Sequence, residues 1–283
     1  MAKYATLNFC TRKKEQAMKK LIDAHTHIFP DAIAQRAADN IGNYYGIPME
    51  GNGTASMLKG RSPKDVDCRY IISAAAMKAK NVITGNDFLL NCAKADSSFI
   101  PFGSFHPDMG EAEAVAEIER IAKAGAYGIK IHSDFQHLYI DEPKMMPMYR
   151  KCAELGLPVL FHVGDVNTDY STPKRMHNLC MALPELKVIA AHLGGYSVWQ
   201  EARDYLLGSE VYMDCSESVP YISEEETYGL IMSYGIDKVL FGSDFPVFCT
   251  DTYFKMIDRL PFTEEEKEKL YFKNAEKLLG LEG

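Results

Sequence analysis

Short runs of apolar residues alternate with longer, charge-rich stretches along most of the chain. Eight apolar runs can be recognised, and each is followed by a stretch of helical character. They span residues 20–29, 69–76, 99–106, 127–133, 158–164, 187–193, 211–215 and 238–244. Runs this apolar, each followed by a helix, are typical of parallel strands that helices cover on their outer side.

Eight strand–helix units predict a closed (β/α)8 TIM barrel rather than an open, doubly wound sheet. The 283 residues suit one such barrel, which typically takes about 250. Gly194-Gly195 follows a strand but lacks the G-x-G-x-x-G spacing of a dinucleotide-binding turn. We therefore expect a single barrel domain over residues 18–283, preceded by an N-terminal extension at residues 1–17.

One connection is unusually long and rich in glycine, at about residues 43–63. Loops of this length are usually functional or disordered. Because it follows the first strand, it should leave the C-terminal face of the barrel, where active sites lie. We predict a mobile cover over the barrel mouth, with Lys59 and Arg61 available to bind a substrate carboxylate.

Composition narrows the function classes. The formal charge of -8 and the pI of about 5.5 argue against a nucleic-acid partner. No apolar stretch approaches the roughly 18 residues of a membrane helix. The seven cysteines are scattered singly, with no C-x-x-C pair, which favours reduced thiols in a cytoplasmic protein. The expected partner is a small-molecule substrate, and a homo-oligomer is left open.

Candidate metal ligands occur at the ends of four predicted strands. His25 and His27 lie two apart on the first strand, so alternation places both side chains on one side. His162, His192 and Asp244 end the fifth, sixth and eighth strands. Each feature alone is weak, since Asp244 would also serve as a helix cap. Together, imidazoles and a carboxylate at one level of a barrel predict a divalent-metal site with a position open for water.

Several motifs strengthen this interpretation. They are DAHTHIFP (23–30), GIKIH (128–132), LFHVGD (160–165), IAAHLGG (189–195) and LFGSDFP (240–246). These segments resemble the amidohydrolase superfamily, and in particular its amidohydrolase 2 branch. The resemblance covers nearly everything from residue 20 to residue 282, and it is specific for the family but poor for the substrate.

The resemblance implies roles for five residues. His25, His27, His162 and Asp244 match the metal ligands, and the expected cofactor is one divalent ion, zinc first and manganese as the alternative. His192 matches the histidine that polarises substrate or orients the bound water, and Asp244 often doubles as the base. A bound divalent metal lowers the pKa of its water towards about 7, and a neighbouring carboxylate can take and return a proton.

Lys130 needs separate treatment, because some superfamily members carry a carbamylated lysine on strand four that bridges two metals. If Ile129 and Ile131 face the helices, Lys130 and His132 face inward. Lys130 could equally pair with an acid or bind an anionic substrate. The amidohydrolase 2 branch usually works with one metal, so we expect one ion and no carbamylation. The candidate substrate contacts are His106, Lys130, His132 and Arg61.

Three functions compete at this point. The first is hydrolysis of a C–N amide or lactone-type carbonyl, in which metal-activated water attacks and His192 stabilises the oxyanion. The alternative is non-oxidative decarboxylation of a small aromatic or enoic acid, which Lys59 or Arg61 reaching the metal would favour. The third is a metal-binding barrel without turnover. Of these, the sequence favours hydrolysis.

Overall fold

The computed structural model describes residues 19–282, and the predicted extension at residues 1–17 lies outside them. Its strands are β1 (Lys19–His27), β2 (Val66–Ser73), β3 (Phe99–Gly103), β4 (Gly128–Ile131), β5 (Val159–Phe161), β6 (Val188–Ala190), β7 (Tyr212–Asp214) and β8 (Val239–Leu240). All neighbouring strands are parallel and follow chain order. The ring closes where the Ala24 amide donates to the Phe241 carbonyl and the Asp244 amide to the His25 carbonyl, each at 2.8 Å. The predicted single-domain TIM barrel is confirmed.

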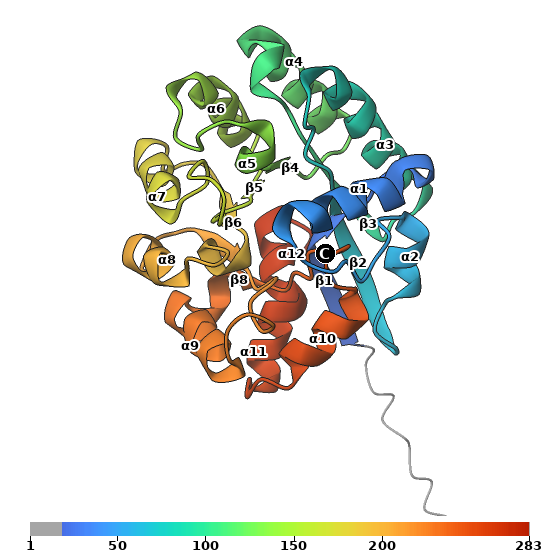
Figure 1. The fold of residues 1–283 in the computed structure, drawn as a ribbon, viewed down its shortest axis with the longest axis vertical. Coiled ribbons are helices and arrows are strands. Elements are labelled where there is room, and N and C mark those ends of the chain that lie inside the picture. Colours follow the sequence, from blue (N-terminus) through green and yellow to red (C-terminus); the bar gives the residue numbers. More distant parts are fainter. Residues whose placement is uncertain (1–18, 283) are drawn as a thin grey trace, which may run out of the picture.

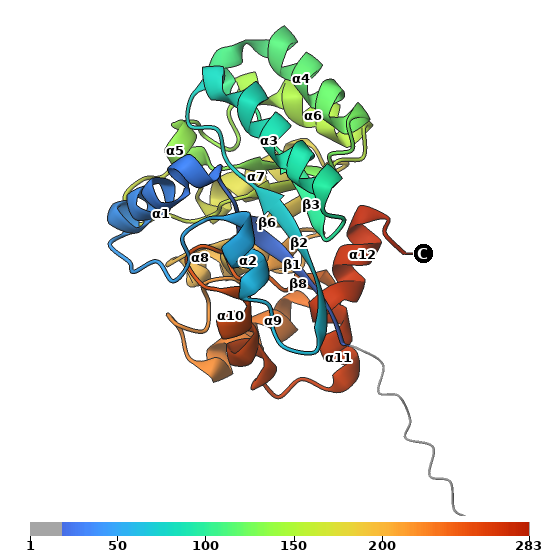
Figure 2. The same ribbon diagram turned by 90° about the vertical axis from the view of Figure 1, so that its right-hand side faces the viewer.

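The helices surround this ring (Figure 1). They are α1 (Asp31–Tyr45), α2 (Ala55–Gly60), α3 (Val82–Ala95), α4 (Glu111–Lys123), α5 (Ser133–Gln136), α6 (Met146–Glu154), α7 (Pro173–Ala182), α8 (Trp199–Leu206), α9 (Glu224–Tyr234), α10 (Thr250–Asp258), α11 (Glu264–Glu268) and α12 (Asn274–Leu279). A five-residue π-helical turn joins α11 to α12. Helices α1 and α5 lie on the side where the strands end, and α12 lies at the opposite end (Figure 2).

The barrel interior is filled by apolar side chains near the N-terminal ends of the strands. Ile22, Ala24, Leu160 and Ile189 belong to one buried cluster, which α12 closes with Leu278. A larger cluster lies between the strands and the outer helices. The polar side chains of the barrel therefore gather above the inner cluster, towards the C-terminal ends of the strands.

An irregularity in β1 directs its two histidines. The pairing of β1 with β2 shifts register between Asp23 and Thr26. Strict alternation from Ile22 and Ala24, which pack in the inner cluster, would point His25 outward. The shift adds one residue, as a bulge does, and turns His25 and its i+2 neighbour inward. Alternation thus predicted correctly that the pair shares a side, while the bulge decides which side.

The long connection differs from its prediction. Residues 43–45 still belong to α1, and residues 55–60 form α2. Leu58 is fully buried against Tyr70 and its neighbours on the outside of the barrel, and the Gly51 amide donates to the Pro246 carbonyl at 2.9 Å. The segment is therefore a packed element, and the element that lies over the barrel mouth is α1.

Two expectations about environment can be compared with the described residues. Their six cysteines are all free. Among residues 19–282, none of the helices combines the length and the apolar character that crossing a membrane requires.

Candidate active site

Two imidazoles from β1 direct their Nε2 atoms towards the centre of the barrel mouth, where Lys130 Nζ approaches that of His25. His25 directs Nδ1 to Asp214 Oδ2 at 2.9 Å, and His27 directs Nδ1 to Ser73 Oγ at 3.0 Å. A carboxylate only accepts, and the Ser73 hydroxyl already donates to the Thr26 carbonyl, so in both rings Nδ1 carries the hydrogen. The two Nε2 atoms, 3.2 Å apart, therefore carry lone pairs. Such outer partners are typical of histidines that bind metals.

A carboxylate oxygen lies against both nitrogens. Asp244 Oδ1 is 3.1 Å from His25 Nε2 and 3.1 Å from His27 Nε2. It is buried and accepts no hydrogen bond from the described residues. Three acceptors this close repel one another unless a cation or a proton lies between them. Imidazole nitrogen and carboxylate oxygen are ligands of zinc and manganese, so the residues present fit a divalent metal.

The seventh strand supplies acids that the sequence analysis missed. Asp214 ends β7 and touches His25, while Ser216 Oγ contacts His192 Nδ1 at 2.9 Å. Burial would raise the pKa of Asp214, but His25, His192 and Ser216 together lower it. Glu217 adjoins Asp244, and its pKa is raised well above the usual value by burial and by that neighbour. An acid at a strand end was a visible signal, of the same kind that identified Asp244.

Lys130 and His132 face inward, as predicted. Lys130 is fully buried, and its Nζ lies 2.8 Å from His25 Nε2. Burial lowers the pKa of Lys130 to about 8, although nearby carboxylates, chiefly Asp244, oppose the shift. This lysine therefore belongs to the histidine cluster. Whether it binds substrate stays a prediction.

The sixth-strand histidine lies behind the others. Because the Ser216 hydroxyl donates to Asp214, it accepts from His192 Nδ1, and His192 Nε2 is left to accept from His162 Nδ1 at 3.0 Å. One nitrogen each of His25, His192 and one oxygen of Asp244 lie within 4.8 Å of one another. However, His192 is fully buried and does not line the cavity that His25, His27, His162 and Asp244 border. Its predicted contact with substrate remains a prediction.

The outer side of the centre carries a tyrosine that sequence reasoning did not single out. The hydroxyl of Tyr45, at the end of α1, lies 3.3 Å from His162 Nε2 and 3.3 Å from His132 Nε2. It donates to Asp165 Oδ2 at 3.1 Å. His132 stacks between His162 and Phe135, with ring centroids 4.1 and 3.9 Å away. Nothing local in the sequence shows that α1 crosses the mouth.

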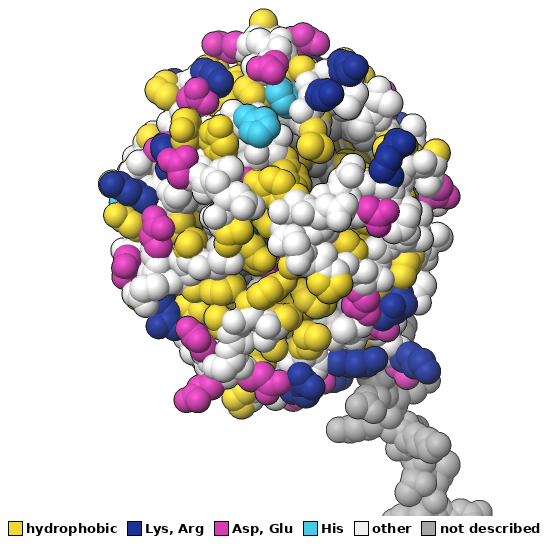
Figure 3. Space-filling view, viewed as in Figure 1, with side chains coloured by type: hydrophobic (Ala, Val, Ile, Leu, Met, Phe, Trp, Pro, Cys, Tyr) yellow, Lys and Arg dark blue, Asp and Glu magenta, His cyan; other side chains and the backbone are white. Residues whose placement is uncertain are grey.

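Two adjoining cavities open from this centre. The inner one, about 30 Å³, is lined by His25, His27, His162 and Asp244 together with Ile41, Tyr45, His132, Phe135, Glu217, Pro246 and Val247. The outer one, about 340 Å³, has mainly apolar and aromatic walls and shares His27, Ile41, His132 and Phe135 with the inner one. Figure 3 shows hydrophobic side chains across the middle of this face and charged ones around its rim.

Two of the predicted substrate contacts lie elsewhere. Arg61 donates to Glu50 Oε1 at 2.6 Å and to Asp251 Oδ1 at 3.1 Å, on the side of the barrel. His106 accepts from the Asp108 amide at 3.1 Å and caps a short 3-10 turn. Neither lines the inner or the outer cavity. The acidic partners of Arg61, one of them 190 residues away, are invisible in the local sequence, and its contact with substrate stays a prediction.

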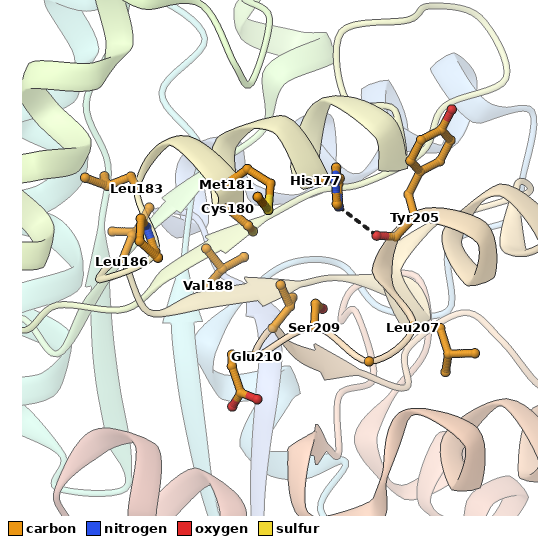
Figure 4. Close-up of a pocket in the computed structure, with 13 residues that line it drawn as sticks. His177, Cys180, Met181, Leu183, Leu186, Val188, Tyr205, Leu207, Ser209 and Glu210 are labelled. Atoms are coloured by element: carbon orange, nitrogen blue, oxygen red, sulfur yellow. Dashed lines mark hydrogen bonds between the residues drawn. The ribbon is translucent and has the colours of Figure 1, made fainter.

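A separate groove of about 380 Å³ lies between α7 and α8, near the starts of β6 and β7 (Figure 4). Its lining is mostly apolar, including Cys180, Leu183 and Val188. The ring of His177 faces the Tyr205 carbonyl, 3.0 Å from Nδ1. Catalytic groups of such barrels lie at the opposite ends of the strands, so this groove is not the active site.

Comparison with known proteins agrees with the geometry. The family model described as Amidohydrolase, Amidohydro_2, matches residues 22–281. The chain belongs to the amidohydrolase family. Both the recognised motifs and the convergent histidines lie inside the matched range, so the predicted family is confirmed. The amidohydrolase match shows a class of enzymes and leaves the reaction of this member open.

Solved structures similar to this amidohydrolase include three decarboxylases. One is 5-carboxyvanillate decarboxylase from Sphingomonas paucimobilis, with a TM-score of 0.68, 16% identity, and 93% of this chain and 99% of that chain covered. Another is 2,6-dihydroxybenzoate decarboxylase from Rhizobium, with a TM-score of 0.70, 17% identity, and 94% of this chain and 100% of that chain covered. The third is dihydroxybenzoic acid decarboxylase from Polaromonas, with bound manganese and the inhibitor 2-nitroresorcinol. Its TM-score is 0.66 at 17% identity, and 94% of this chain and 98% of that chain are covered. At these identities the similarity shows the shared fold.

Proposed function

We propose that this protein is a metal-dependent, non-oxidative decarboxylase of a small aromatic acid. The observation that carries the proposal is the outer cavity, which directly adjoins the histidine centre. Phe29, Tyr44 and Phe135 contribute aromatic side chains to its walls, and His27 and His132 join it to the centre. Flat aromatic surfaces of this kind favour a planar ring.

The structural neighbours support the same class of substrate. Three of them are named as decarboxylases of hydroxylated benzoates, and one was determined with manganese and an aromatic inhibitor. Their fold extends over more than nine-tenths of this chain. This favours decarboxylation over the hydrolysis that the sequence alone had favoured. Lys59, which pairs with Asp96, and Arg61 line neither cavity and do not contribute to the argument.

His25, His27 and Asp244 would hold the divalent ion, and His162 is the fourth candidate because it lines the same inner cavity. When bound, zinc or manganese supplies a Lewis acid that takes up negative charge on substrate oxygens. Asp214 and Ser73 keep the two β1 imidazoles in the tautomers that expose Nε2. We expect one ion per chain.

The reaction breaks the bond between the ring carbon and the carboxylate. Carbon dioxide leaves, and the electron pair of that bond takes up a proton on the ring carbon. Asp244 faces the inner cavity, and we propose that its carboxyl group passes this proton from Glu217 to the ring carbon. Although burial opposes the shift, His25 and His27 keep the pKa of Asp244 well below its usual value, so the proton is held on Glu217 between turnovers. Glu217 lies beside it, with a pKa raised by burial, and can return a proton to Asp244 for the next turnover.

Hydrolysis of an amide or lactone remains the second candidate. Asp244 Oδ1 accepts no hydrogen bond among the described residues, so it could take a proton from a water molecule as readily as give one to carbon. The two reactions thus share the same centre and differ in what the cavities admit.

Product analysis separates the two. Protein loaded with zinc or manganese would be incubated in D2O with a panel of hydroxybenzoates, and in parallel with small amides and lactones. We expect carbon dioxide release and one ring deuterium per turnover, both abolished in Asp244→Asn. Turnover of an amide or lactone, with no carbon dioxide from any acid, would replace decarboxylation by hydrolysis.

A further inference from the structure

Helix α1 borders both cavities. Ile41 lines the inner and the outer cavity, Tyr45 lines the inner one, and Tyr44 lines the outer one. On the opposite side, Phe135 is also common to both. Ile41 and Phe135 therefore form a partition between the histidine centre and the aromatic-walled space.

The volumes of the inner and outer cavities imply that Ile41 and Phe135 must move apart when an aromatic acid binds. A water molecule needs about 10–15 Å³ of such space, so the inner cavity of about 30 Å³ cannot hold a benzoate. The outer cavity, about 340 Å³, is large enough but is not lined by Asp244. An aromatic acid can bring its carboxylate to Asp244 only if its ring lies across the partition.

The packing of helix α1 permits Ile41 to move in this way. Its buried residues are Ala34, Ala38 and Gly42, three small residues four apart. Burial of such small side chains stabilises a helix little, and elements with few buried apolar contacts open at low cost. The helix ends at Gly46, whose φ of 68° suits a glycine. Lifting its last turn breaks the contacts of Tyr45 with His132, His162 and Asp165 and the edge-to-face contact of Tyr44 with Phe135.

The hydroxyl of Tyr45 is the polar group at this entrance. It contacts His132 and His162 and donates to Asp165. An incoming carboxylate can take the place of Asp165 as the acceptor for this hydroxyl. Tyr127 offers a contrast, because it is an exposed tyrosine that lines neither cavity.

We infer that Ile41 and Tyr45 are substrate-contacting residues that determine which aromatic acids bind. The ring lies across the partition, with the carboxylate in the inner cavity and the distal ring edge in the outer cavity. Ile41 limits the width of the ring, and Tyr45 donates a hydrogen bond to the carboxylate. The choice of an aromatic acid as ligand rests on the proposed function.

Binding without turnover tests the role of Ile41. The full chain, loaded with zinc, would be titrated calorimetrically with benzoate and with the wider 2-naphthoate. Ile41→Ala should raise the affinity for naphthoate relative to benzoate by about tenfold, the effect of removing bulk from an apolar pocket. Ile33→Ala is the control, because Ile33 is an exposed residue of the same helix and lines neither cavity.

The role of Tyr45 has its own pair of variants. Tyr45→Phe should weaken benzoate binding about fivefold, as expected for one lost hydrogen bond. Tyr127→Phe, in an exposed tyrosine that lines neither cavity, should leave benzoate affinity unchanged. Equal effects of the two substitutions would remove Tyr45 from the carboxylate site.

The outcomes separate this inference from the proposed function. An unchanged affinity ratio in Ile41→Ala, with metal content and melting temperature intact, overturns the partition even if carbon dioxide is released from hydroxybenzoates. A raised ratio supports the partition even if no acid is decarboxylated. Failure of benzoate and naphthoate to bind at all also overturns it.

Discussion

The two sides of the histidine centre are built differently. On the side of β1, β7 and β8, His25 and His27 have Nδ1 fixed by Asp214 and Ser73, and Asp244 is joined to the His25 carbonyl through its amide. These groups are almost fully buried. Such an arrangement holds ligand atoms in fixed positions, which a metal ion requires.

On the side of α1, β4 and β5, the contacts of the Tyr45 hydroxyl with the histidines are longer. The Tyr45 hydroxyl is 3.3 Å from each of His132 and His162. The helix that carries it is seated on small residues. We conclude that the buried side is suited to hold an ion and the open side to admit and select a substrate, so substitutions on the two sides should have separable effects.

The largest effect is expected from His25→Ala. Loss of this imidazole removes a ligand nitrogen and leaves Asp214 and Asp244 without their shared partner, so we expect both bound metal and activity to disappear. Elemental analysis of protein purified without chelator measures this directly. His106→Ala should retain the metal, because His106 caps a short turn outside the cluster. Full metal content in His25→Ala would mean that His25 is not a ligand of the metal.

A smaller effect on the same side is expected from Asp214→Asn. The amide can no longer hold the His25 tautomer as a carboxylate does, and loss of such an outer partner typically weakens metal affinity by about 10–100-fold. Asp165→Asn is the matched change on the open side and should leave metal affinity unchanged. Competition with a fluorescent zinc chelator gives both values. Similar losses in both variants would abolish the distinction between the two sides.

The sequence predicted the rigid side better than the open one. His25, His27 and Asp244 were recognised because strand ends have a fixed place in a barrel. Asp214 satisfied the same rule and was overlooked.

On the open side, the same rule predicted His132 and His162, which line the inner cavity, but it could not predict Tyr45. Where α1 crosses the mouth depends on how the whole helix packs, which is not encoded near Tyr45. The segment predicted as a cover, residues 43–63, begins within α1, so Tyr44 and Tyr45 line the cavities, while its later part is packed in a way that the sequence did not suggest. Its glycines suggested freedom, but Gly51 lies where a Cβ would meet Phe245 at 2.4 Å, so this glycine permits close packing.

The smallest expected effect concerns pH. Burial lowers the pKa of His27 to about 4, and Asp244 only partly offsets the shift. Below the unfolded value of about 6.5, the unfolded chain takes up a proton that the folded chain refuses, so stability falls as pH drops from 6.5 towards 4. Urea unfolding of chelator-treated protein should show wild type losing about 2 kcal/mol more than His27→Gln between pH 7 and pH 5. Equal losses would mean that this imidazole is not held neutral by burial.

The closure of the barrel links the first strand to the last, and this has a consequence for the order of events during biosynthesis. Ser243 donates to Asp23 across 220 residues of chain, next to the point where Asp244 meets the β1 histidines. Contacts of such long sequence separation form late in folding. The ribosome must therefore finish β8 before the metal site exists. The β1 histidines of the nascent chain therefore lack their carboxylate partner until then, and acquisition of the ion becomes a sign that β8 has been made and has joined β1.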